Sequence, residues 1–456
     1  MAFNNSSLGA ALNSTPKNII VQSNIEEPIH PDDATWILTS AFIIFTMQSG
    51  FGLLEAGMVS KKNETNVMVK NVIDVVYGGL SYWLFGFAFS FGQINSNSFC
   101  GLGYFMMDAD DDEMSLFAKY FFQLSFATTA TTIVSGAMAE RVSLKAYMVY
   151  SFINTISYCF PAHWLWAKDG WLAKMGAIDI AGCGPVHLVG GVSGLVATMM
   201  LKPRVGRFNS EKEEGSGHLR MASPSNVLLG TFMLWWGWLG FNCGSTFGIT
   251  GGKWKLASRA AVVTINGSIG GGIFSTMYSY ALFGNKLLID VFITGILGGL
   301  VGITGICAIV RPGESFIIGF IGGAVACLGL SLMNRLKIDD PVGCIPTHGF
   351  AGIWGLLSVA LFSEVDNLEK LSTEFGVLKG GRWRLLGVQF LSTAVIIVWT
   401  GLTSFILLFV IDKIIGLRVP LCRELEGADK WEHGIFPQIQ SSIDDEPEES
   451  QIDTPN

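Results

Sequence analysis

Charged residues are scarce in this sequence. Of its 456 residues only 14% are Asp, Glu, Lys or Arg, whereas 50% are hydrophobic. A water-soluble domain carries nearer a quarter charged residues, because it must cover its surface with groups that water solvates. The shortage of charge therefore excludes an ordinary soluble protein. The net charge of −8 comes partly from acidic loops and an acidic tail, so it gives no indication of a nucleic-acid partner.

A cleavable secretion signal and a disulfide framework are also missing. The first 34 residues are polar and contain no apolar core behind a basic end, so we expect the first spanning helix to direct its own insertion. Most of the eight cysteines lie inside apolar runs, which is not the pattern of a disulfide scaffold. Cys100 and Cys183 both fall in loops expected outside, so a bridge between these two stays open.

What the sequence has instead is apolar runs of about 20 residues, the length that crosses ~30 Å of hydrocarbon at 1.5 Å per residue. The 55 glycines allow such helices to pack closely in lipid. We predict an all-α polytopic membrane protein with an N-terminal tail (1–34), a transmembrane domain (35–415) and a C-terminal tail (416–456). The eleven predicted spans are 35–57, 67–92, 115–138, 145–166, 185–202, 224–247, 257–283, 288–310, 315–334, 346–363 and 386–415.

Lysine and arginine are unevenly distributed between alternate loops. One set of loops contains Lys61 and a basic cluster between 202 and 220, whereas the loop 93–114 contains neither Lys nor Arg. Basic loops stay in the cytoplasm, so the bias favours a cell-membrane protein with an extracellular N-terminus and a cytoplasmic C-terminus. The bias is modest, because four basic residues fall in the other set. Sequons at Asn5 and Asn13 predict a glycoprotein and agree with that orientation.

A segment of 17 residues occurs twice, at 179–195 and at 340–356. The two copies are identical at 8 of 17 aligned positions, which include an Asp, a Cys, a Pro and a His. They open the fifth and tenth spans, and because five crossings separate them they enter the membrane from opposite faces. This predicts an inverted repeat of helices 1–5 and 6–10, as in secondary transporters, whose substrate path runs between the halves. The alternative is that Gly- and Pro-rich helix starts simply resemble one another.

His187 and His348 occupy the same position in the two copies. An imidazole in hydrocarbon is costly unless it has a partner, so intramembrane histidines tend to face a cavity or each other. If the two helices are tilted, both histidines approach the middle of the membrane. Two structural histidines bonded to carbonyls are the alternative. Asp179 is placed to cap the helix start or to attract a cation, and the two roles do not exclude each other, whereas its counterpart Asp340 is expected only to cap.

Several blocks of this sequence resemble the Amt branch of the Amt/Rh superfamily of ammonium transporters, and the resemblance runs from about residue 33 to 437. The blocks are Phe122-Gln-Leu-Ser-Phe126, Ser135-Gly-Ala-Met-Ala-Glu-Arg141, Ala162-His-Trp-Leu-Trp166, 179–191, Gly237-Trp-Leu-Gly-Phe241-Asn-Cys-Gly-Ser245, 339–349 and, in the tail, 416–419 and 426–434.

The resemblance implies a homotrimer in the lipid bilayer with one pore per subunit, carrying ammonium or methylammonium, with no enzymatic activity, cofactor or metal. It also implies roles for individual residues. These are Trp166, Ser245, Phe126 and Asp179 at the outer recruitment site, Phe126 and Phe241 as the gate, His187 and His348 in the pore, and Phe122 and Trp238 in support. The intact pore set favours a transporter, whereas a sensor with little flux and an electroneutral ammonia channel remain open.

Two rival interpretations rest on other chemistry. Cys183 and His187, like Cys344 and His348, are spaced i,i+4 and could hold a metal or haem, although the intervening prolines argue against one helical face. An intramembrane hydrolase would need a serine nucleophile, and no Gly-x-Ser-x-Gly elbow is present. The tail has Trp431 where plant members often carry a phosphorylatable Thr, so regulation by phosphorylation at that position is not expected.

Overall fold

The computed structural model describes residues 29–110, 113–208 and 221–436, and within these ranges every regular element is a helix. Four short segments, η2 to η5, are π-helical and continue into α-helices. The elements that build the helices of the bundle are α1 (Pro31–Phe45), α2 (Met47–Met58), α3 (Glu64–Ile73), η2 (Asp74–Gly78), α4 (Gly79–Ser81), η3 (Tyr82–Gly86), α5 (Phe87–Phe91), α6 (Ser115–Met138), α7 (Leu144–Trp166), η4 (Cys183–Leu188), α9 (Val189–Leu201), α10 (Pro224–Gly244), α11 (Lys253–Leu282), α12 (Ile289–Thr304), α13 (Pro312–Arg335), η5 (Ile345–Phe350), α14 (Ala351–Phe362) and α15 (Trp383–Ile414). The remaining elements are η1 (Lys61–Asn63), α8 (Trp171–Lys174), η6 (Val377–Lys379), α16 (Leu421–Glu426) and α17 (Ala428–His433).

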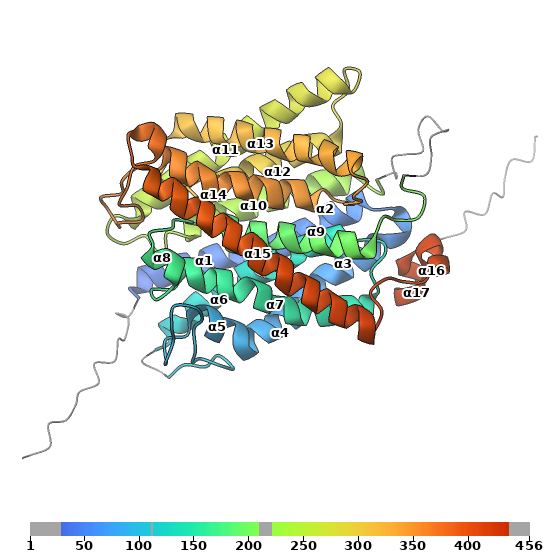
Figure 1. Ribbon diagram of the computed structural model, residues 1–456, viewed down its shortest axis with the longest axis horizontal. Coiled ribbons are helices and arrows are strands. Elements are labelled where there is room, and N and C mark those ends of the chain that lie inside the picture. The colour runs from blue at the N-terminus through green and yellow to red at the C-terminus, as the bar shows by residue number, and fades with distance from the viewer. Residues whose placement is uncertain (1–28, 111–112, 209–220, 437–456) are drawn as a thin grey trace, which may run out of the picture.

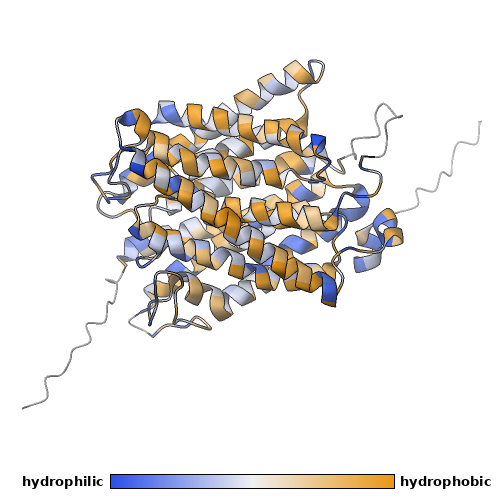
Figure 2. Cartoon of the chain, in the orientation of Figure 1, coloured by the Kyte–Doolittle hydropathy of each residue, from blue (hydrophilic) through white to orange (hydrophobic). Residues whose placement is uncertain are grey.

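Seven helical stretches in the described ranges are long and apolar enough to cross a membrane, and α12 is a shorter apolar helix. Figure 2 shows apolar residues along the helices and hydrophilic residues gathered toward the two ends of the bundle. The predicted all-α, multi-pass membrane class is thereby confirmed. α6, α7 and α10 have 24, 23 and 21 residues but are not among the seven.

The helices lie alongside one another in a single bundle (Figure 1). α16 and α17 lie at one end, which we call the tail end, and α8 lies at the other, which we call the α8 end. The small residues expected from the composition bring some helices into backbone contact. A Cβ atom on Gly319 of α13 would lie only 1.9 Å from the carbonyl oxygen of Gly267 in α11, so a larger residue there would force these helices apart.

A buried ionic cluster joins the loops at the tail end. Arg204 is 7% exposed and Asp339 is 1% exposed, and the guanidinium donates two hydrogen bonds of 2.8 Å to that carboxylate. Arg204 also lies 3.1 Å from Glu140, and Arg141 donates to the backbone carbonyl of Asp339 at 2.7 Å. The cluster therefore ties three loops together just before the segment that contains His348.

The C-terminal segment packs on the same end of the bundle. Arg418 donates to the carboxylate of Glu424 at 2.9 Å and to the carbonyl of Leu201 at 2.6 Å. Lys62 donates to the carbonyl of Glu424 at 3.0 Å, and the carboxylate of Asp429 accepts from two backbone N–H groups at the start of α3. These contacts hold α16 and α17 against the loop that joins α2 to α3.

The bridge that the sequence left open does not form, and two other sequence features lie outside the described residues. Cys100 and Cys183 are both free thiols, so the bridge left open between them is absent. Cys183 is buried, and its Sγ donates to the carbonyl of Val301 at 3.0 Å instead. The sequons at Asn5 and Asn13 lie outside the described residues, as does the acidic run in the tail.

Asp339 is the titratable group on which the tail-end cluster depends. Burial by itself raises the pKa of this carboxyl group, but the hydrogen bonds and charge of Arg204 outweigh that effect and lower it to about 2. A lowered pKa in the folded state means that the stabilisation is present above the ordinary value of 3.8 and is lost as the pH falls toward 2.

We expect Asp339→Asn to lower the free energy of unfolding by about 3 kcal/mol, because it removes the carboxylate that accepts two hydrogen bonds from the buried Arg204 and leaves Glu140 as the remaining ionic partner. The apparent Tm in detergent measures the effect. The gap between wild type and variant should stay constant above about pH 4 and shrink below it. Asp169→Asn is the control, since Asp169 pairs with Lys174 on the surface and its loss should cost under about 1 kcal/mol. Equal Tm values for D339N and D169N would contradict the prediction.

Candidate functional site

The two copies of the repeated segment fold alike. In the first, the carboxylate of Asp179 accepts backbone N–H groups three, four and five residues on, at 2.9, 2.9 and 2.7 Å. In the second, Asp340 accepts those three and five residues on, at 3.0 and 2.7 Å. Gly182 and Gly343 then take positive φ values of 96° and 80° and lead into the π-helical segments η4 and η5. Both carboxylates therefore cap a helix start, which supplies the partners that buried backbone N–H groups require.

The two capped helices begin at opposite ends of the bundle. η4 follows Asp179 near the α8 end, and α9 continues to Arg204 at the tail end. η5 begins just after Asp339 at the tail end, and α14 runs back. Where they cross they touch through glycine: a Cβ on Gly191 would lie 2.2 Å from the backbone nitrogen of Gly349.

This crossing places His187 against His348. Their Nδ1 atoms are 3.1 Å apart, so one ring donates a hydrogen bond to the other, and the ring centroids are 5.2 Å apart. The two side chains are 0% and 3% exposed. Nε2 of His187 has no hydrogen-bond partner among the described residues. Trp238 stacks on His187 at 5.1 Å and is itself held by a 2.8 Å hydrogen bond from its Nε1 to Thr304 Oγ1.

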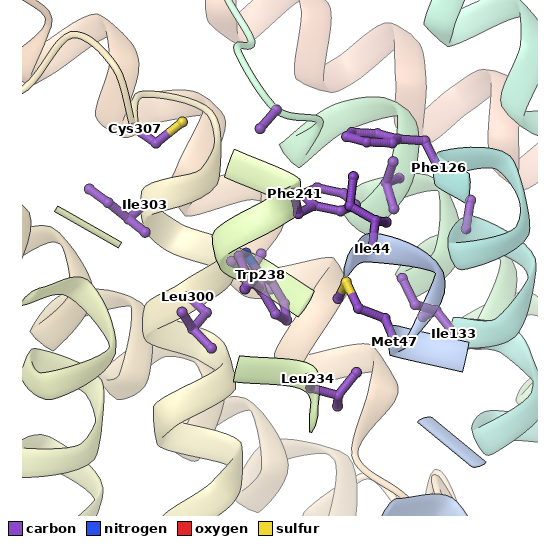
Figure 3. Close-up of a cluster of buried hydrophobic side chains, with 14 of the residues drawn as sticks. Ile44, Met47, Phe126, Ile133, Leu234, Trp238, Phe241, Leu300, Ile303 and Cys307 are labelled. Atoms are coloured by element: carbon purple, nitrogen blue, oxygen red, sulfur yellow. The ribbon is translucent and has the colours of Figure 1, made fainter. Parts of the chain in front are cut away.

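Stacked phenylalanines lie on the side of the histidine pair that faces the α8 end. Phe126 of α6 and Phe241 of α10 stack with their centroids 4.0 Å apart and their planes at 14° (Figure 3). Phe241 is 5.7 Å from His187, and Phe122 packs behind Phe126 at 4.8 Å. The rings of Phe126 and Phe241 leave no room for water between them, so they close the column of side chains that leads to the histidines.

A cavity of about 800 Å³ opens beyond this stack toward the α8 end, and we call it the vestibule. Trp166, Asp179, Ser245 and Phe126 all line it. Nε1 of Trp166 donates to the backbone carbonyl of Asp179 at 2.7 Å, which fixes the indole ring beside Phe126. The hydroxyl of Ser245 donates to the carbonyl of Phe241 at 2.8 Å, so its oxygen can still accept a hydrogen bond from a ligand.

A second, much smaller cavity of about 20 Å³ lies on the tail-end side of His348. It is lined by His348 together with Cys344 and Thr347, and by two carboxylates, Glu55 of α2 and Asp290 of α12. The vestibule and this tail-end cavity are therefore separated by Phe126, Phe241 and the histidine pair.

The sequence interpretation overlooked three residues close to this path. Glu55, Lys70 and Asp74 are all buried, and Glu55 lines the tail-end cavity. A usable signal was present, because each is an ionisable residue inside a predicted span, where such residues are costly and usually functional. Thr304, which accepts the hydrogen bond from Trp238, was also overlooked, and as an uncharged residue it gave no such signal.

The side chains between the two cavities, which are the stacked phenylalanines and the histidine pair, carry no fixed charge, and this decides which ligands suit them. The π faces and acceptor oxygen of the vestibule suit a small cation that has shed part of its water. The apolar stack below them opposes any bare ion. No group of three or more His, Cys, Asp or Glu side chains arranged to hold a metal occurs within residues 29–110, 113–208 and 221–436. The thiol of Cys183 donates to a backbone carbonyl rather than joining His187 in a ligand set.

A sequence profile of the Ammonium Transporter Family matches residues 35–437. The chain belongs to this family. Putative ammonium transporter 3 of Caenorhabditis elegans is 49% identical over 423 residues, covering 90% of this chain and 61% of that protein, so the chain spans about three fifths of that relative's length. Putative ammonium transporter 2 of the same organism is 42% identical over 424 residues, covering 89% of this chain and 81% of that protein.

A solved structure described as a sensor Amt protein superposes with a TM-score of 0.80 at 30% identity, covering 88% of this chain and 98% of that one. The family assignment confirms the resemblance stated from the sequence blocks. It also accounts for the membrane class, since these relatives are named as transporters of ammonium.

We expect Gly191→Ala to lower the free energy of unfolding by about 1–3 kcal/mol, because the new methyl group forces α9 and η5 apart. The same displacement should lengthen the His187–His348 contact and reduce substrate flux. Gly401→Ala in α15 is the matched control, since a Cβ there meets nothing within 4 Å. Apparent Tm in detergent and uptake in proteoliposomes measure both effects. Wild-type stability and uptake in G191A would contradict the prediction.

Proposed function

We propose that this chain transports ammonium across a membrane, as NH4+ or as NH3 plus a proton, through the column that joins the vestibule to the tail-end cavity. The observation that carries the proposal is the buried His187–His348 pair between the two cavities. When His187 donates through Nδ1 to His348, its Nε2, which lacks a partner among the described residues, can accept an N–H group or a proton. A purely structural histidine would have both ring nitrogens satisfied.

The vestibule is the proposed recruitment site. An ammonium ion there would exchange part of its water shell for the π faces of Trp166 and Phe126 and for the acceptor oxygen of Ser245. Asp179 lines the same cavity, and its carboxylate adds negative potential although its oxygens already cap η4. The sequence left open whether Asp179 caps or attracts a cation, and its position is compatible with both roles.

The stacked pair Phe126 and Phe241 is the proposed gate. Its rings must swing aside for a substrate to pass, since their centroids are only 4.0 Å apart. Below the rings an ion that keeps its charge without water is costly, which favours deprotonation and passage of ammonia along the histidines. Potassium ion can neither donate hydrogen bonds nor release a proton, so the same column would reject it.

The wider architecture is also part of the proposal. It comprises eleven spans within 35–415, an inverted repeat of helices 1–5 and 6–10, and a homotrimer in the plasma membrane with tails 1–34 outside and 416–456 inside. The opposite directions of the two capped helices support the repeat. Arg204 and Arg418 at the tail end support a cytoplasmic tail end, because basic residues stay on that side.

A sensor with little flux is the second candidate, favoured by the similarity to the structure described as a sensor Amt protein. An electroneutral ammonia channel is the third. Voltage-clamped oocytes expressing the chain separate all three when current and labelled methylammonium uptake are measured together at fixed pH. A saturating inward current that tracks uptake supports electrogenic transport, uptake without current supports an ammonia channel, and neither, in protein at the surface, supports a sensor.

We expect Trp166→Leu to raise the methylammonium concentration for half-maximal uptake roughly tenfold, the equivalent of about 1.4 kcal/mol, through loss of one cation–π contact. The maximal rate should change less, because the gate and the histidines are untouched. Trp383→Leu is the matched control, since Trp383 is 72% exposed at the start of α15 and is not among the residues that line the vestibule. Concentration-dependent uptake measures both, and equal half-saturation in W166L and wild type would contradict the recruitment role.

A further inference from the structure

A buried charged cluster lies beside the tail-end cavity and has no part in the proposed gate or histidine pair. It consists of Glu55 of α2, Lys70 of α3 and Asp74 of η2, which are 1%, 0% and 0% exposed. The charges of Lys70 and Asp74 both act on Glu55. Burying three ionisable groups is costly, so their presence calls for an explanation beyond packing.

The two carboxylates have different surroundings. Asp74 accepts hydrogen bonds from the hydroxyl groups of Tyr147, Ser151 and Thr132, at 2.7, 2.8 and 3.0 Å for the shortest contact of each. Tyr147 and Ser151 stabilise its ionised form, whereas the single hydroxyl proton of Thr132 is shared with Gln48 Oε1 at 2.8 Å. Lys70, four residues earlier on the same helical stretch, lies over the ring of Tyr147 at 5.8 Å. Asp74 is therefore equipped to keep its negative charge.

Glu55 is less completely satisfied. One oxygen, Oε2, accepts from Ser135 Oγ at 2.6 Å and from Asn71 Nδ2 at 3.0 Å. The other, Oε1, is buried and has no hydrogen-bond partner among the described residues. Nζ of Lys70 also has no hydrogen-bond partner among the described residues, so it does not bond directly to either carboxylate. Its one positive charge balances one of the two negative charges, so the cluster becomes neutral when it takes up one proton, which fits Oε1 of Glu55.

Glu55 is also placed to exchange a proton with the histidines. It lines the tail-end cavity together with His348. Phe51, one turn earlier on α2, packs on the ring of His348 at 6.1 Å, so Glu55 lies about 6 Å farther along the helix toward the tail end. The cavity volume of about 20 Å³ is enough for one water molecule, which needs roughly 10–15 Å³.

We propose that Glu55 is the proton acceptor on the tail-end side of the histidine pair. This inference rests on the proposed function. A proton released from ammonium at the gate protonates the histidine pair; it then leaves the His348 imidazolium, whose N–H bond breaks, and forms an O–H bond at Oε1 of Glu55. Glu55 in turn releases the proton to water in the tail-end cavity. The ammonia passes separately and recovers a proton in bulk water.

The test is the ratio of charge moved to methylammonium taken up in voltage-clamped oocytes, with surface expression measured alongside. Glu55→Gln keeps the size of the side chain and the acceptor for Ser135 but cannot carry the proton. We expect this ratio to fall at least tenfold in E55Q while uptake continues, and Glu55→Asp to restore at least half of it. Asp290→Asn, which removes the other carboxylate that lines the cavity, should match wild type.

A wild-type ratio in E55Q overturns the relay and leaves ammonium transport standing. Equal loss of current and uptake in E55Q at normal surface expression also overturns it, because that result indicates a structural role. The same fall in D290N would show that removing either carboxylate has this effect, and would overturn the assignment to Glu55. Uptake without current in the wild type overturns the relay and favours the ammonia channel over transport with a proton, whereas absence of uptake in the wild type overturns ammonium transport and the relay with it.

Discussion

The close approach of two helix backbones at Gly191 and Gly349 is the constraint on which the rest of the site depends. At position 191 only glycine permits it, whereas a Cβ on Gly349 would make an ordinary contact at 3.6 Å. The approach brings His187 and His348 within hydrogen-bond distance although they come from opposite ends of the bundle. Each helix start must then be stabilised inside the protein, which Asp179 and Asp340 do by accepting backbone N–H groups. One packing contact thus explains the glycines, the aspartates and the histidines of the repeated segment together.

Uncharged rings lie along the path between the two cavities, and charged side chains lie at its two ends. The column between the two cavities contains aromatic rings and imidazoles. An aromatic ring carries no charge after a cation leaves its π face, and an imidazolium becomes neutral when it loses its proton. Fixed charges lie at its margins. Asp179 borders the vestibule, Glu55 borders the tail-end cavity, and the Arg204–Asp339 pair closes the tail end. A substrate that can give up its proton is suited to such a path.

The membrane class and the paired helix starts could be predicted from the sequence, because the length of an apolar run and a repeated segment can both be read along the chain. Spans such as 115–138 and 145–166 match α6 and α7 closely, and the Asp-to-His spacing of the repeat reappears as two capped helix starts. The stacking of Phe126 on Phe241 and the bond from Trp166 to Asp179 depend on tertiary packing, so from the sequence alone they came only through the family resemblance. The cluster around Glu55 was missed because Glu55 lies on α2 whereas Lys70 and Asp74 lie four residues apart on the next helical stretch, and no spacing along the chain brings Glu55 to the other two.

The central claim is that ammonium passes along the His187–His348 pair and that this pair excludes ions that cannot release a proton. The most direct measurement is the ratio of ammonium to potassium permeability, by voltage clamp, in His187→Ala and His348→Ala beside wild type, with the oligomer checked by gel filtration. Our account predicts that each variant stays folded and either loses ammonium flux or admits potassium. Wild-type selectivity and rate in both variants would contradict it.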